Sequence, residues 1–261
     1  MRIALGIEYD GRLYTGWQSQ PDGNTVQDAL QAAVGAIAGA PVRLHAAGRT
    51  DTGVHATEQV AHFDAPQARP ETAWVRGVNA LLPASIAVRW AHPVPEAFHA
   101  RFSATGRSYR YVLLNRPVRS ALLDGKVGWF HAPLDEAAMQ DAALHLIGMH
   151  DFSAFRAAEC QAKTPVKNLA RLSVTRSGDL IVFDLDADAF LHHMVRNIVG
   201  CLVYVGKGRY PADWMKTVLE SRDRKIAAPT FMPDGLYLRK IRYDAHWGLP
   251  QLADSGNVCG L

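Results

Sequence analysis

Two apolar-rich runs separated by a four-residue turn constrain the fold of this chain most strongly. Leu169–Thr175 and Leu180–Ala187 both read as strands, and they flank Arg176-Ser177-Gly178-Asp179, which has the composition of a tight turn. A connection this short favours antiparallel pairing, because parallel strands need a crossover of a dozen or more residues. Since strands and helices are mixed in the same way elsewhere in the chain, we predict an α+β fold with antiparallel sheets.

The remaining elements divide the chain into two halves that are loosely similar in element order. Further strands are predicted over Arg2–Tyr9, Val42–Ala47, Gln59–Phe63, Ile86–Trp90, Ser108–Leu114 and Leu236–Ile241. Helices are predicted from the N-cap Thr25 to Ile37 and over Pro70–Leu82, Leu134–Ile147, Phe190–Val205 and Ala212–Ser221. We expect an N-terminal half over 1–114, a turn-rich connection over 115–131, a C-terminal half over 132–245 and a tail without clear pattern over 246–261.

Composition excludes several classes of protein. The apolar fraction of 48% and charged fraction of 20% are those of a globular protein, and a net charge of +3 is too small to indicate a nucleic-acid partner. No apolar run is long enough to cross a membrane and no signal peptide is recognisable, so we expect a cytoplasmic protein. The cysteines, Cys160, Cys201 and Cys259, lie far apart, which argues against a zinc site or a disulfide framework.

The segment that is richest in groups able to carry chemistry lies between two predicted strands. Its sequence is Gly48-Arg49-Thr50-Asp51-Thr52-Gly53-Val54-His55-Ala56. Arg49 and Asp51 are two residues apart, so in an extended segment both can lie on one face, where a guanidinium would keep the carboxylate ionised. A turn carrying a surface ion pair explains the same letters. Asp51-Thr52-Gly53 also matches the tripeptide of aspartic proteases, which need two such carboxylates, and here only a symmetric dimer could supply the second.

A basic segment suggests an RNA partner. Between Arg101 and Arg119 there is no acidic residue, and aromatic side chains alternate with the cations Arg101, Arg107, Arg110, Arg116 and Arg119. Cations can follow phosphates while aromatic rings contact bases, although charged strand faces are usually just solvated. The adjacent His192 and His193 are expected to point in different directions on a helix, and we predict no metal site.

Six ordered blocks carry a resemblance to a known family. The segment Gly48–Ala56 resembles the GRTDxGVHA signature of the tRNA pseudouridine synthase A family. The other blocks are the Tyr9-Asp10-Gly11…Gly16-Trp17-Gln18 segment, Phe98–Ala104 with Tyr109-Arg110-Tyr111, Asp151–Arg156, His193–Gly200 and Gly235–Leu238. The resemblance extends over about residues 3–243. Lys167 departs from it, because an arginine is expected there and a lysine cannot form the same bidentate contacts.

The resemblance implies a fold, a reaction and a site. It implies two similar α/β-mixed halves whose antiparallel sheets join across a central active-site cleft, in a homodimer that uses no cofactor or metal. It implies isomerisation of uridine to pseudouridine at positions 38, 39 and 40 of the anticodon stem-loop of tRNAs. The implied site consists of Asp51 as nucleophile or base, Arg49, Arg196 as the partner of Asp51, and Tyr109 and Leu238 against the uracil. The basic segment adds Arg107 and Arg110 as predicted RNA contacts. A tRNA-binding module without catalytic activity stays open as an alternative.

Overall fold

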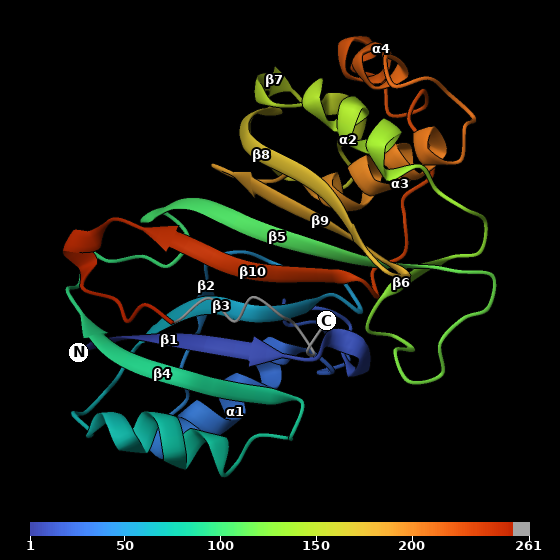
Figure 1. The fold of residues 1–261 in the computed structure, drawn as a ribbon. Coiled ribbons are helices and arrows are strands. Elements are labelled where there is room, and N and C mark those ends of the chain that lie inside the picture. Colours follow the sequence, from blue (N-terminus) through green and yellow to red (C-terminus); the bar gives the residue numbers. More distant parts are fainter. Residues whose placement is uncertain (253–261) are drawn as a thin grey trace. The chain divides into compact units, whose positions relative to one another are not determined.

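The computed structural model describes residues 1–252, which form two compact units (Figure 1). Unit 1 comprises Met1–Thr105 together with residues 238–252, and unit 2 comprises Gly106–Tyr237. The chain therefore enters unit 2 within strand β5 (Ala104–Asn115) and returns to unit 1 within strand β10 (Leu236–Tyr243). The sequence-based division placed these boundaries at 114/115 and 245/246, and it did not include a return of the last strand to the first unit.

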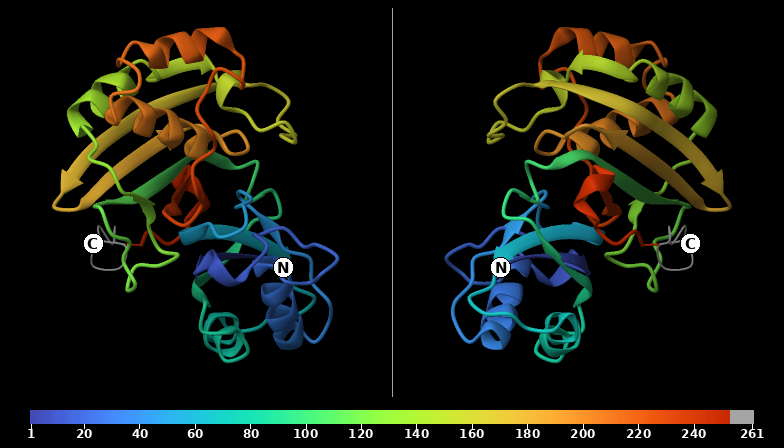
Figure 2. Two further views of the ribbon diagram at one scale, coloured as in Figure 1. Left: turned by 90° about the vertical axis from the view of Figure 1, so that its right-hand side faces the viewer. Right: turned by 90° about the vertical axis from the view of Figure 1, so that its left-hand side faces the viewer.

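Unit 1 is built around a sheet whose strands follow the order β4-β1-β3-β10. The elements that precede β5 are β1 (Arg2–Tyr9), α1 (Val26–Ala38), β2 (His45–Ala46), β3 (His55–Asp64), a helix over 71–79 and β4 (Ile86–Val94). The central strand β1 pairs antiparallel with both neighbours, so that Leu5 lies opposite Ala61 of β3 and Ala91 of β4. The two helices cover one face of this sheet (Figure 2), where Trp74 packs edge-on against Phe63.

Helix α1 begins and ends where the sequence places its signals. The hydroxyl of Thr25 accepts a hydrogen bond from the amide of Asp28, which satisfies an otherwise unpaired donor of the first turn. Gly39 ends the helix with φ 75°, a conformation that favours glycine. The apolar positions Leu30 and Val34 are fully buried, as the helical spacing predicts.

Unit 2 contains the antiparallel strands β5-β9-β8-β7, in that order, and β6 pairs parallel to β5. Its elements after β5 are β6 (Gly128–Phe130), α2 (Glu136–Leu144), β7 (Gly148–Asp151), β8 (Val166–Ser177), β9 (Leu180–Ala187), α3 (Met194–Gly206) and α4 (Trp214–Ser221). The predicted hairpin is confirmed, with Ser177 opposite Leu180. Alternate residues of β9 are buried, and α2, α3 and α4 cover one side of this sheet (Figure 2).

Several local expectations differ from the structure. The strands β6 and β7 were not predicted because they are only three and four residues long. Helix α3 begins at Met194 rather than Phe190, since His193 has φ 61° and stops the helical backbone before it. The helix predicted over Pro70–Leu82 extends over 71–79, and Leu81 beyond its end is 54% exposed. Cys259 lies outside the described residues, and within them no helix combines the length and apolarity that crossing a membrane requires.

Candidate active site

The loop between β2 and β3 carries Asp51, and hydrogen bonds hold it at both ends. On the entry side, the side-chain amide of the fully buried Gln59 donates to the carbonyl of Gly48 over 2.8 Å. On the exit side, the amide of Val54 donates to the carbonyl of Asp51 over 3.1 Å, and Gly53 between them has φ 79°. This turn favours glycine at that position, which explains one of the two glycines of the motif.

The N-terminal segment braces the residue next to Asp51. The hydroxyls of Tyr9 and Thr50 are hydrogen-bonded over 2.8 Å in a buried position, and the amide of Trp17 donates to the carbonyl of Thr50 over 3.0 Å. Gly16 has φ 102°, and a Cβ atom there would lie 2.7 Å from the carbonyl oxygen of Thr50. The Tyr-Asp-Gly and Gly-Trp-Gln blocks, to which the sequence analysis assigns no role of their own, therefore support the loop that carries Asp51.

A buried histidine follows the loop and fixes the segment after β1. The Nδ1 atom of His55 accepts the amide hydrogen of Gly11 over 3.1 Å, so Nδ1 carries no proton in this arrangement. Nearby, Asp10 forms hydrogen bonds with Arg12. Burial acts to raise the pKa of Asp10, but the hydrogen bonds from Arg12 outweigh it and leave the pKa below its usual range.

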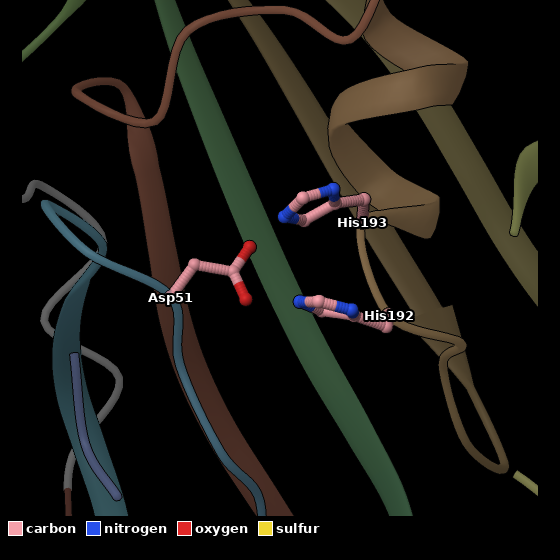
Figure 3. Close-up of side chains that lie close together, drawn as sticks. All are labelled: Asp51, His192 and His193. Carbon is pink, nitrogen blue, oxygen red and sulfur yellow. The ribbon is translucent and has the colours of Figure 1, made fainter. Parts of the chain in front are cut away.

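The structure places Asp51 and the two adjacent histidines on identifiable elements. Figure 3 labels Asp51 on the loop between β2 and β3 of unit 1, and His192 and His193 on the segment that precedes α3 of unit 2. Asp51 is half-buried, whereas Arg49 is exposed. A half-buried carboxylate combines partial shielding from water with access for a substrate.

Tyr109 lies on β5, where it pairs in register with Leu185 of β9. Its side chain is only 9% exposed, and its ring packs edge-on against Phe190 with centroids 4.9 Å apart. An aromatic contact of this geometry fixes the ring plane. The ring is therefore held in one orientation on a sheet strand.

Arg107 and Arg110 point to opposite faces of β5, because they are an odd number of residues apart on one strand. Arg107 donates to the carbonyl of Asp188 over 3.0 Å. Arg110 forms a bidentate ion pair with Asp184 of β9, at 2.8 and 3.0 Å, in which both side chains are almost buried. The acidic partner of Arg110 thus comes from the neighbouring strand, which the local sequence does not reveal.

Arg196 lies on the first turn of α3 and is half-buried. Its Nε atom donates to the carbonyl of Phe231 over 2.8 Å, and the amide of Phe231 donates back to the carbonyl of Arg196. His192 and His193 precede the helix, and their rings lie side by side with centroids 4.1 Å apart, contrary to the expectation that they diverge on a helix. Because a non-glycine residue with positive φ is strained, the backbone of His193 is a feature typical of functional sites.

The two remaining site residues are both buried. Leu238 is fully buried on β10. Lys167 is 8% exposed and donates to the carbonyls of Thr164 and Val166 over 2.8 Å. The lysine that departs from the family pattern therefore stabilises its own loop, and it is not part of an exposed basic surface.

Comparisons with known proteins agree with this α+β architecture and with the GRTD loop. A family model for tRNA pseudouridine synthase matches residues 6–103 and 142–244. A relative from Dechloromonas aromatica, called tRNA pseudouridine synthase A, is 65% identical over 97% of each chain. A relative of the same name from Chromobacterium violaceum is 63% identical over 99% of each chain. A crystal structure of a Cbf5-Nop10-Gar1 complex aligns at 13% identity with a TM-score of 0.33, over 86% of this chain and 60% of that one.

These matches define an RNA-modifying isomerase with a mixed fold and a mostly antiparallel sheet arrangement. The chain belongs to the tRNA pseudouridine synthase family, whose members convert uridine to pseudouridine in tRNA. The predicted family, fold class and enzyme class are thereby confirmed. The aspartic-protease and binding-module alternatives lose their basis.

Proposed function

We propose that this chain isomerises uridines 38, 39 and 40 in the anticodon stem-loop of tRNAs, with Asp51 as the catalytic carboxylate. The observation that carries the proposal is the loop itself. Asp51 is half-buried in a turn that is tied down on both sides and braced by the N-terminal segment. A reacting group held this firmly has its orientation set before the substrate binds.

The reaction gains and loses no atoms overall. The bond between N1 and C1′ breaks, the uracil turns, and a bond between C5 and C1′ forms while the C5 proton leaves and N1 acquires one. A carboxylate can start this either by attacking the nucleoside or by removing a proton from the sugar. Both routes use Asp51 as an ionised carboxylate, and neither route needs a cofactor.

The other site residues support the carboxylate and the base. We propose Arg196 as the positive partner of Asp51, which is the role that the family resemblance implies for this half-buried arginine. The exposed Arg49 would contact the phosphate next to the target or hold the base out of its stack. The fixed ring of Tyr109 would stack on uracil and its hydroxyl would relay the C5 proton, while Leu238 would floor the pocket.

The two arginines of β5 are assigned different roles. Arg107 is retained as a candidate phosphate contact. Arg110 is already neutralised by Asp184, and an ion-paired guanidinium has little charge left for a phosphate, so we assign it instead to holding β5 against β9. The resemblance supports a homodimer, and the tRNA substrate supports a cytoplasmic setting.

The test is tritium release from tRNA that carries 5-tritiated uridine, because this isomerisation exchanges that position. Asp51→Asn should lower release by at least about a thousandfold while tRNA affinity stays near that of the unmodified enzyme. Asp141→Asn, at an exposed position of α2, is the matched control. Near-normal release by Asp51→Asn removes Asp51 from the mechanism. Release from uridines outside 38–40 overturns the assigned positions.

A further inference from the structure

Phe102 is a large apolar side chain that the structure holds in solvent. It lies between β4 and β5 in unit 1 and is 76% exposed. Single exposed apolar residues are common and need no function on their own. Two further features set this phenylalanine apart, namely the rigidity of its loop and the aromatic rings behind it.

The loop around Phe102 is locked by hydrogen bonds. The amide of His99 donates to the hydroxyl of Ser103 over 3.0 Å, and the amide of Ser103 donates to the carbonyl of His99 over 2.8 Å. Between them, the amide of Arg101 donates to Nδ1 of His99, and the amide of Ala100 donates to Nδ1 of His62. The exposure of the phenylalanine is therefore built into an ordered turn.

Phe102 forms the outer end of a cluster of aromatic rings, in which His99 contacts His62 edge-on. Its centroid lies 4.3 Å from that of His99, which lies 4.6 Å from His62, which in turn lies 5.1 Å from His45. The inner ring of His62 is only 2% exposed, and its burial lowers its pKa to about 4, so this ring is uncharged at neutral pH. This series of ring contacts thus leads from the buried His62 in the core of unit 1 to the exposed ring of Phe102.

A cation accompanies the exposed ring. The guanidinium of the exposed Arg101 lies 5.9 Å from the ring centroid of Phe102. An aromatic face beside an arginine is the combination by which proteins hold single-stranded nucleic acid, with the ring stacking on a base and the cation near the backbone. Aromatic rings and arginines are also enriched at protein–protein interfaces, so a second copy of this chain is the competing occupant that the experiment must exclude.

We propose that Phe102 is a stacking platform for an unpaired base of the substrate tRNA and that Arg101 contacts an adjacent phosphate. The inference rests on the proposed function in one respect, since it takes tRNA as the substrate. Because the ring belongs to the binding step, its loss should raise KM and leave kcat near its original value. It also gives a role to the Phe98–Ala104 segment, which the catalytic assignments leave unused.

The experiment measures tRNA affinity in an Asp51→Asn background and steady-state tritium release in the active enzyme. Phe102→Ala should weaken binding roughly 5- to 150-fold, the range expected for one stacked base. Phe102→Trp should restore binding, because it keeps an aromatic face. Leu122→Ala, which removes another exposed apolar side chain at 89% exposure, is the control and should bind normally.

Salt dependence separates the two residues. Arg101→Gln should reduce the slope of log affinity against log salt by about 0.7, whereas Phe102→Ala should leave the slope unchanged. Wild-type affinity for Phe102→Ala overturns the platform, as does dissociation of the enzyme into monomers, which would assign this surface to subunit contact. If the unmodified enzyme releases no tritium, the proposed function fails, whatever Phe102→Ala binds.

Discussion

The hydroxyl of Tyr9 on β1 lies 2.8 Å from the hydroxyl of Thr50, and this buried hydrogen bond connects the first strand to the residue immediately before Asp51. The two residues are far apart in sequence, and they belong to two different motifs. Their contact explains why the N-terminal block and the GRTD loop occur together. Through this contact with Thr50, strand β1 restrains the backbone next to the carboxylate of Asp51.

We expect Tyr9→Phe to lower kcat about two- to tenfold, which corresponds to the loss of one typical hydrogen bond, while KM for tRNA stays unchanged. Thr50→Ser keeps a hydroxyl and should retain activity, whereas Thr50→Val should resemble Tyr9→Phe. Steady-state kinetics of the three variants, with thermal unfolding measured in parallel, test this. Equal kcat for Thr50→Ser and Thr50→Val would show that the hydrogen bond does not position Asp51.

A pair of glycines separates backbone strain from steric contact. Gly16 and Gly23 both have positive φ, but a Cβ atom at Gly16 would lie 2.7 Å from the carbonyl of Thr50, whereas at Gly23 it would meet nothing within 4 Å. Gly16→Ala should therefore lower both the melting temperature and tritium release, because the loop must move. Gly23→Ala should cost only about 1 kcal/mol of stability, from φ alone. Similar release by both variants would contradict this.

The ion pair between Arg110 and Asp184 should matter for folding more than for RNA. Arg110→Gln removes the bidentate partner of a nearly buried carboxylate and leaves it with the longer 3.4 Å contact with the exposed Arg171, so we expect a loss of about 2 kcal/mol in the free energy of unfolding. Because Asp184 already neutralises this arginine, the salt dependence of tRNA binding should stay as it is. Adding Asp184→Asn should restore part of the stability. A flatter salt slope for Arg110→Gln would mean that Arg110 contacts RNA after all.

Acid should destabilise the cluster that His45, His62 and His99 form in unit 1. Burial and the neighbouring positive charges lower the pKa of His62 to about 4, whereas in the unfolded chain it titrates near 6.5. Between these values the unfolded chain binds the additional proton, so stability is fully present above about pH 6.5 and falls toward pH 4, by at most about 1.4 kcal/mol per pH unit.

Urea unfolding at pH 7.5 and pH 5 measures this dependence. His62→Gln should reduce the loss between the two pH values, and His131→Gln, outside the cluster, should not. Asp64 and Arg2 face the same histidine, so the comparison is made at constant ionic strength. A loss that is the same for His62→Gln and the unmodified chain would exclude His62 as its source.

The sequence predicted well where local signals decide the structure. The boundaries of β1 and β9 match the predicted runs, and Thr25 caps α1, because apolar alternation and capping chemistry act over a few residues. Asp184, the partner of Arg110, was not foreseen, because it lies 74 residues further along the chain. The positive φ of His193 has no composition signal, since that conformation is imposed by its surroundings.

The return of the chain to unit 1 in β10 has a consequence for synthesis on the ribosome. The hydroxyl of Thr57 on β3 donates to the carbonyl of Arg239 on β10, a separation of 182 residues. Unit 1 therefore cannot complete its sheet until all of unit 2 has been translated, and until then β3 lacks its pairing with β10. Pairing between residues this far apart in sequence slows folding. The protein therefore most needs a chaperone while only its N-terminal portion has been synthesised.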